Sequence, residues 1–163
     1  MTESDAVHAP VTLAREPAAL AVAGRLLHDF NTEYDDPSPG AAALAVRLGA
    51  LVDDGDTEVL LVGNDGAGDA QGVAVLRFRR SLWTPADECY LAELYVVPQR
   101  RGAGLGRTLL RSCVERAEAR GCDFIDLSTS EDDVAARHLY EAEGFRRTEG
   151  EGGPLAFHYE RDL

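Results

Sequence analysis

Lysine is absent from the 163-residue sequence: all 16 basic residues are arginine, and 29 acidic residues bring the formal net charge to −13. The absence of lysine excludes a phosphate-binding P-loop, which ends in Gly-Lys. Apolar runs stay well short of the about 18 residues that a membrane-spanning helix needs. The first residues are acidic and lack a basic-then-apolar signal pattern, so we expect a cytoplasmic protein. The negative charge repels nucleic acid and anionic lipid, and we expect neither as a partner.

Metal-ligand and disulfide patterns are also lacking. The three cysteines, Cys89, Cys113 and Cys122, have no CxxC spacing and an odd count, so we expect buried or free thiols in a reducing compartment. The four histidines are scattered, at His8, His28, His138 and His158. Without a pair four residues apart or a cluster, we expect no metal site.

The length and composition, 45% hydrophobic and 28% charged, are typical of one globular domain over 1–163. Periodicity predicts helices over 17–31, 41–52, 104–120 and 131–143. Strands are predicted over 11–15, 57–63, 72–80, 88–97, 122–128, 145–149 and 155–160, with turns at 64–70 and 81–87 and an acidic loop at 31–40. The order βααβββαβαββ predicts a mixed α/β (α+β) fold, with a central sheet flanked by helices and a βαβ unit after a meander.

The charge is unevenly distributed along the chain. Residues 1–98 carry 6 Arg against 16 acids (−10), residues 99–121 carry 6 against 2 (+4), and residues 122–163 carry 4 against 11 (−7). Two interpretations of the basic segment stay open: a solvated helix face, or a binding site for an anion.

The basic segment coincides with a strand–turn–helix pattern, LYVVPQRRGAGLGR over 94–107, in which three glycines occupy alternate positions. Glycine lets the backbone curl around a ligand, and the unpaired N–H groups and dipole of the helix start suit a phosphate or pyrophosphate. Arg100, Arg101 and Arg107 add positive charge there. A dinucleotide fingerprint, G-x-G-x-x-G, is excluded because the residue three after Gly104 is Arg107.

Two segments carry a family resemblance. Residues 94–110, LYVVPQRRGAGLGRTLL, resemble the acetyl-CoA-binding motif of the GNAT superfamily of N-acetyltransferases, (Gln/Arg)-x-x-Gly-x-(Gly/Ala), with Arg101, Gly104 and Gly106 at its defined positions. Residues 136–145, ARHLYEAEGF, are similar to the family's A-x-x-L-Y-x-x-x-G-F motif. Many members have Asn seven residues before the tyrosine, in contact with the pantetheine arm of the co-substrate; this chain has Asp133 there, which leaves that contact open.

The resemblance implies acetyl-CoA as co-substrate and no metal. The pyrophosphate would lie on backbone N–H groups of the glycine-rich turn and helix start, namely those of Gly102, Ala103, Gly104, Leu105, Gly106 and Arg107. The pantetheine arm would pair, like an added strand, with the backbone of Leu94, Tyr95 and Val96, beside a bulge. The N–H of Val96 would hold the thioester oxygen as it gains negative charge.

The resemblance also implies that Tyr140 protonates the departing thiolate, since a phenol of pKa about 10 is protonated at neutral pH. The alternative is that Tyr140 only packs an amphipathic helix. By strand alternation, Glu93 shares an otherwise apolar face with Leu91, Tyr95 and Val97. Burial there would raise its pKa and make it a candidate base, while the alternative is an edge residue that reaches solvent.

The resemblance further implies that the loop between the first two helices lines the acceptor site, and here that loop begins FNTEYDD over 30–36. Its aromatic and acidic side chains suit a cation, through ion pairing and cation–π contact; they are Phe30, Glu33, Tyr34 and Asp35. A solvated acidic turn is the alternative. Asp132 and Asp133 either add to this negative field or, with Ser130, cap a helix.

The expected acceptor is therefore a small cationic amine: a polyamine, an aminoglycoside or an amino-acid derivative. The strand at 92–96 and the acidic segment before Tyr140 also resemble the aminoglycoside 3-N-acetyltransferase branch. Two alternatives stay open, an acetyltransferase of proteins or peptides and a non-catalytic acyl-CoA-binding sensor module. Members of the family often form homodimers through the last strands, which is a further open alternative.

Overall fold

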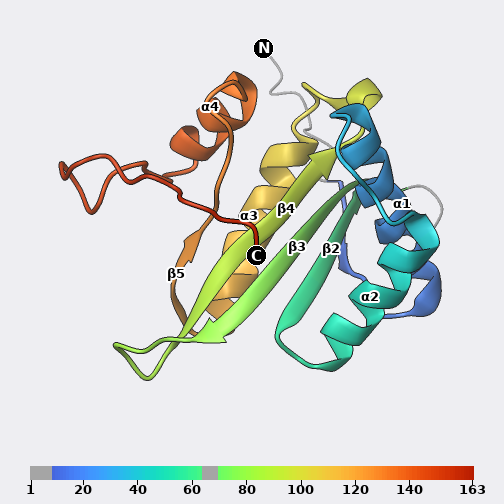
Figure 1. The fold of residues 1–163 in the computed structure, drawn as a ribbon, viewed down its shortest axis with the longest axis horizontal. Helices are drawn as coiled ribbons and strands as arrows, with labels where there is room; N and C mark the ends of the chain where they lie inside the picture. The colour runs from blue at the N-terminus through green and yellow to red at the C-terminus, as the bar shows by residue number, and fades with distance from the viewer. Residues whose placement is uncertain (1–8, 64–69) are drawn as a thin grey trace, which may run out of the picture. The chain divides into compact units, whose positions relative to one another are not determined.

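The computed structural model describes residues 9–63 and 70–163, which form two compact units, one ending at Ile125 and one running from Asp126 to Leu163 (Figure 1). His8 and most of the predicted turn at 64–70 lie outside the described residues. No helix in the described ranges is long and apolar enough to cross a membrane. Within the same ranges, no three His, Cys, Asp or Glu residues are placed to hold a metal ion.

The first unit is a sheet with helices on both faces. Its helices and strands are β1 (Val11–Leu13), α1 (Pro17–Glu33), α2 (Ala41–Asp53), β2 (Thr57–Gly63), β3 (Ala70–Arg80), β4 (Asp87–Val96), the 3-10 turn η1 (Pro98–Arg100), α3 (Leu105–Ala119) and β5 (Cys122–Asp126). The strand order is β1-β2-β3-β4-β5, and the first four strands are antiparallel. After the crossover helix α3, β5 runs beside β4 in the same direction (Figure 1). The predicted mixed α/β fold and its element order are confirmed over this part of the chain.

Strand alternation divides the core between the two faces of the sheet. One face packs against α1 and α2, and its buried strand residues are Val59, Leu61, Val73, Val75 and Tyr95. The other face packs against α3, whose apolar stripe, Leu105, Leu109, Cys113 and Ala117, is buried. Figure 1 shows α2 and α3 on opposite sides of the sheet. The sheet therefore holds β4 rigidly between two layers of helix.

Strand β4 contains a bulge at Ala92. Val75 of β3 lies opposite Glu93, but the next residue, Leu76, lies opposite Leu91, so Ala92 is an extra residue without a partner. Because Val75 and Leu76 face opposite sides of the sheet, Glu93 and Leu91 do so as well. The expectation that they share a face was wrong, since simple alternation holds only within a regular ladder.

The second unit contains one helix, α4 (Val134–Ala142). The Asp133 carboxylate caps it by accepting a hydrogen bond from the Ala136 N–H at 3.1 Å, and Gly144, at φ 87°, follows its end. The two strands predicted at 145–149 and 155–160 are reduced to one antiparallel bridge between Thr148 and Leu155. The EGEGGP segment between them leaves only a short, isolated hairpin, and a hairpin with so few ladder hydrogen bonds is only marginally stable.

Candidate active site

The outer edge of β4 carries backbone groups that β3 does not use. The Val97 N–H donates to the Gln71 carbonyl at 2.9 Å, so alternate residues of β4 bond to β3 and the intervening residues Leu94 and Val96 direct their N–H and C=O groups the other way. This is the edge that the sequence assigned to a pantetheine arm.

Only the first half of β4 has β5 at that edge. The Thr84 hydroxyl, in the turn before β4, donates to the Asp123 carboxylate of β5. Thr84 lies shortly before β4 and Asp123 lies at the start of β5, so the two neighbouring strands begin side by side. Since β5 ends at Asp126 and parallel strands advance equally per residue, it stops near the bulge. The edge at Leu94 and Val96 therefore lies beyond the end of β5.

The turn after β4 leaves space around the first residues of α3. Gly102 and Gly104 have φ of 80° and 84°, the left-handed region that favours glycine, and a Cβ at either position would meet no atom within 4 Å. No side chain of the described residues caps α3, and its first internal hydrogen bond runs from the Thr108 N–H to the Gly104 carbonyl at 3.0 Å. The N–H groups of Leu105 and Gly106 precede that bond, at the positive end of the helix dipole. An uncapped helix start beside an open left-handed turn fits a pyrophosphate.

The Arg101 side chain pairs with a carboxylate, whereas the sequence analysis counted its charge toward the phosphate site. Its two terminal nitrogens donate to both carboxylate oxygens of Glu33, at 2.8 and 2.7 Å. Its Nε donates to the Val96 carbonyl at 3.0 Å, and the guanidinium carbon lies 5.6 Å from the centre of the Tyr95 ring. The Arg101 hydrogen bonds hold the pKa of Glu33 below its usual value, so that carboxylate stays ionised and paired. A direct contact of Glu33 with an amine stays a prediction.

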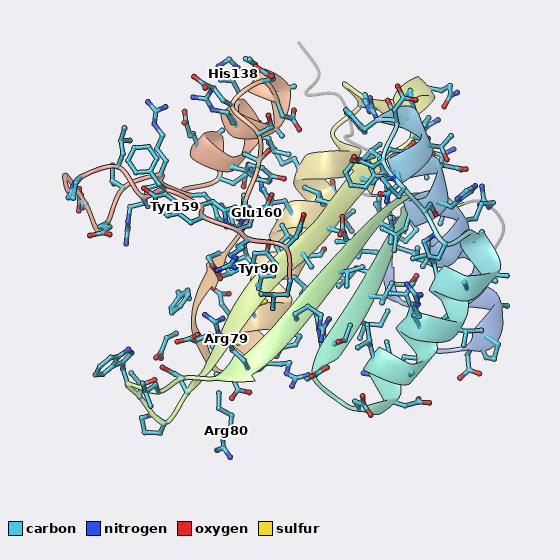
Figure 2. The ribbon with its side chains drawn as sticks, viewed as in Figure 1. Arg79, Arg80, Tyr90, His138, Tyr159 and Glu160 are labelled. Atoms are coloured by element: carbon cyan, nitrogen blue, oxygen red, sulfur yellow. The ribbon has the colours of Figure 1, made fainter. Side chains whose placement is uncertain are left out.

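The basic segment at 99–121 is also less positive at the turn than its +4 count implies. Arg116 binds both oxygens of the buried Glu58 at 2.7 Å, and Arg120 lies 3.6 Å from the same carboxylate. With Arg101 on Glu33, half of the six arginines are paired with carboxylates outside the segment. Arg79 and Arg80 lie at the hairpin end of β3, at the opposite end of the sheet from the turn (Figure 2). The turn itself retains the positive end of the α3 dipole and the formal charge of Arg100.

Aromatic rings line the face of β4 toward α1. The last turn of α1 extends to Glu33, so Phe30 and Glu33 belong to the helix and not to the predicted loop. At spacings of three and four residues, Phe30, Glu33 and Tyr34 share one side of the helix end. Phe30 stacks on Tyr95, with ring centres 5.0 Å apart and planes at 17°, and meets Tyr34 edge-on at 5.4 Å. From the sequence, only the backbone of Tyr95 was expected at the site. Its position two residues after Glu93 on the same strand could have indicated that its side chain lies on the Glu93 face.

The loop after α1 is held against the helix. His28 Nδ1 lies 2.8 Å from the Ser38 hydroxyl, and the Asn31 side-chain amide donates to the Pro37 carbonyl at 2.6 Å. Asp35 adopts a left-handed φ of 56°, the one non-glycine residue in the described ranges to do so. These bonds fix the direction in which the chain leaves the Phe30–Tyr34 pair.

Glu93 lies on the same face as Tyr95, immediately after the bulge. Burial raises the pKa of its carboxyl group, and it forms no ion pair within residues 9–63 and 70–163. A half-buried carboxylate without a cationic partner is a stronger base than an exposed one. The position is therefore compatible with removing a proton from an amine.

Tyr140 lies in α4 of the second unit, with its ring centre 6.0 Å from that of Phe145. Its backbone carbonyl accepts from the Phe145 N–H at 2.9 Å, which closes the helix end. The cap at Asp133 agrees with the helix-capping alternative for that residue. A role of Tyr140 as acid, and a contact of Asp133 with pantetheine, stay predictions.

Comparison with known proteins identifies the family. The model of the acetyltransferase (GNAT) family matches residues 24–145, well over half of the chain. The chain belongs to the GNAT acetyltransferase family. A crystal structure of a protein from Arthrobacter sp. FB24, assigned as an acetyltransferase, is similar with a TM-score of 0.83 and 40% identity, covering 94% of this chain and 96% of that one.

Curated GNAT relatives match over shorter stretches. The thialysine N-epsilon-acetyltransferase of Mus musculus is 32% identical over 98 residues, 57% of this chain and 57% of that protein. The streptothricin acetyltransferase of Streptomyces lavendulae is 32% identical over 98 residues, 60% of this chain and 49% of that protein. The chain thus spans about half the length of these two relatives. GNAT enzymes use acetyl-CoA as co-substrate, and the open edge of β4 and the uncapped start of α3 fit that molecule.

Proposed function

We propose that this GNAT protein transfers an acetyl group from acetyl-CoA to the primary amine of a small cationic molecule. The observation that carries the proposal is the outer edge of β4, which continues past the bulge at Ala92 into the left-handed turn and the uncapped helix α3. The family match over 24–145 runs through both compact units and supports one domain over 1–163. The three free cysteines fit a cytoplasmic protein.

The residues that would hold acetyl-CoA lie on three consecutive segments. The backbone of Leu94 to Val96 pairs with the amides of the pantetheine arm, as a sheet edge pairs with an added strand. The N–H groups of 102–107 surround the pyrophosphate, with Arg100 adding a formal charge. Acetyl-CoA supplies an activated thioester, which an amine attacks directly.

Three groups of the chain assist the attack. Glu93 accepts a proton from the ammonium form of the acceptor, directly or through water, because its raised pKa makes it a competent base. The Val96 N–H stabilises the negative charge that develops on the thioester oxygen. The Tyr140 hydroxyl donates a proton to the departing thiolate. Acyl transfer by direct attack needs no further nucleophile.

The preference for a cation rests on the aromatic face beside Glu93. Tyr34, which is exposed, and the partly exposed Phe30 present ring surface within a strongly acidic chain, and a cation over such a face gains roughly 0.5–1 kcal/mol where it is exposed. Asp35 follows Tyr34 and contributes negative charge. Two GNAT relatives are named as acetyltransferases of thialysine and streptothricin, which supports a small-molecule acceptor.

The test is an acceptor panel in which the release of free CoA from acetyl-CoA is measured at low and high ionic strength. The panel contains polyamines, aminoglycosides and amino-acid derivatives, each beside a neutral amine of similar size, and peptides with free N-termini or lysines. We expect turnover of a small cation, with a KM that rises in high salt because screening weakens the attraction.

Two results would replace the proposal. Activity on peptides alone would make the chain a peptide or protein acetyltransferase. Calorimetric binding of acetyl-CoA without CoA release for any amine would make it an acyl-CoA-binding sensor. Sedimentation of the same sample would show whether it forms the homodimer that many GNAT proteins form.

A further inference from the structure

The Arg101 side chain connects the two sides of the proposed site. Its backbone belongs to the turn that would surround the pyrophosphate, and its Nε holds the Val96 carbonyl at the open edge of β4. Its two remaining nitrogens hold both oxygens of Glu33, in the last turn of α1. One planar guanidinium therefore touches the acetyl-CoA side and the acceptor side at once.

The end of α1 has some contacts of its own. Phe30 stacks on Tyr95, and the Asp36 N–H donates to the Asn31 carbonyl at 2.8 Å. The backbone hydrogen bonds of Tyr34 and Asp35 are longer, at 3.2 to 3.3 Å, and both residues are exposed, so the last turn has little buried apolar surface to keep it closed. Glu33 lies in this turn, and the Arg101 guanidinium ties it to the turn after β4.

We propose that Arg101 and Glu33 are positioning residues that couple acetyl-CoA binding at the turn to the ordering of the acceptor-side end of α1. The inference rests on the proposed function, since it assumes that acetyl-CoA binds at the turn. A ligand that orders the turn and the edge of β4 also fixes the guanidinium between them. The bidentate pair then fixes Glu33, so that the acceptor meets a helix end whose ordering cost is already met.

The coupling has a direction and a reciprocal. Acetyl-CoA raises the affinity for the amine, and the amine raises the affinity for acetyl-CoA by the same factor. Coupling between two sites typically changes the affinity of each for its ligand by about 5- to 150-fold. Arg101 and Glu33 are 68 residues apart in the sequence, so the local structure of neither segment requires them to pair.

The experiment is hydrogen–deuterium exchange of the full chain with and without saturating acetyl-CoA, which requires no knowledge of the amine. We expect acetyl-CoA to slow exchange in peptides covering 102–108 and, by at least about fivefold, in peptides covering 30–36. Glu33→Gln should keep the protection at 102–108 and lose the added protection at 30–36. Arg101→Gln should show the same separation.

Arg100→Gln is the matched control, because it removes the same charge from the same turn without touching Glu33. It should retain both protected regions once acetyl-CoA is raised to saturation. A purely structural role of Glu33 predicts a different pattern: exchange at 30–36 would be faster in the variant with and without acetyl-CoA, and the factor gained on binding would be unchanged.

The outcomes separate the two proposals. Protection at 102–108 with none at 30–36 in the wild-type chain would overturn the coupling and leave the proposed function standing. An added protection at 30–36 that survives Glu33→Gln would overturn it equally. The absence of protection at 102–108 at every acetyl-CoA concentration would overturn the proposed function itself. Once an acceptor is known, Glu33→Gln should raise its KM and leave unchanged the Kd of acetyl-CoA measured without the amine.

Discussion

Gly24 lies where α1 packs closely against the backbone of α2. A Cβ built on it would lie 2.5 Å from the Ala41 carbonyl oxygen, 2.9 Å from the Ala45 nitrogen and 3.2 Å from the Ala45 Cα. All three atoms belong to the backbone of α2, so no side chain can rotate away. Gly24→Ala therefore has to move a helix.

The size of that movement follows from the distances. Ordinary contact begins at 3.4 Å, so the Ala41 oxygen has to retreat by about 0.9 Å from its position 2.5 Å away. Overpacking that moves backbone costs about 1–3 kcal/mol, and the upper value applies because helix α2 is rigid. Alanine regains about 1 kcal/mol of helix propensity over glycine. We expect a net loss of about 2 kcal/mol, which lowers Tm by roughly 4–8 °C in a chain of this length.

Thermal and urea unfolding of Gly24→Ala and Gly49→Ala provide the measurement. Gly49 is the matched control, since it also lies within a helix and its Cβ would meet only the Leu20 Cδ1 atom, at 3.6 Å. Gly49→Ala should therefore gain up to about 1 kcal/mol from helix propensity alone. The two alanine substitutions are expected to change stability in opposite directions.

A Gly24→Ala chain as stable as the wild type would refute this reasoning, because it would mean that α2 yields without cost. The functional consequence gives a second observable. The loop 34–40 joins the two helices, so a displaced α2 moves the acceptor side and leaves the turn at 98–104 in place. KM for the amine should rise, while the Kd of acetyl-CoA stays unchanged.

Three further predictions concern ionisable groups. Glu93→Gln should lower kcat/KM by about 10²- to 10⁴-fold and remove an acidic limb above the usual pKa of 4.5 from the pH–rate profile; a profile identical to the parent would exclude Glu93 as base. Tyr140→Phe should lower kcat at least about tenfold with acetyl-CoA binding retained in calorimetry, and unchanged turnover would exclude the acid role. Glu58→Gln should cost about 2 kcal/mol in urea unfolding at pH 7, below the full value for a buried pair because Arg116 is 34% exposed. Burial raises the pKa of Glu58, but the hydrogen bonds and charges of Arg116 and Arg120 outweigh burial, so the pKa is lowered overall. The ionised carboxylate therefore stabilises the folded chain above pH 4.5, and this stabilisation fades as the pH falls below that value. The difference in stability between the variant and the parent should therefore shrink as the pH falls below 4.5.

Local patterns predicted the local structure well. The helix predicted over 104–120 is present as α3, and the glycines at 102 and 104 adopt the left-handed conformations that a tight strand-to-helix turn requires. Each of these features is decided by residues within a few positions of one another. The helix period and the conformational freedom of glycine are properties of short segments, so the sequence contains them directly.

Features that depend on residues far apart in the sequence were not predicted. The register shift at Ala92 exists only because β4 pairs with β3, and regular alternation concealed that Leu91 and Glu93 face opposite sides. The pairing of Arg101 with Glu33 joins residues 68 positions apart, and nothing in the sequence near either residue indicates it. Charge counting along the chain cannot detect such pairing, because it records the sign of each side chain and not its neighbour.

The bulge at Ala92 also separates what the fold needs from what the site needs. If Ala92 were deleted, Leu91 would still lie opposite Leu76 and Glu93 opposite Val75, so every side chain of β4 would keep its present face. The core would lose only the small Ala92 side chain that packs against it, and the strand would become regular. What would disappear is the local bend and added twist that a bulge imposes at the point where β5 stops. A one-residue deletion therefore defines a chain that keeps nearly all of its hydrophobic core and loses the bend beside the open edge of β4.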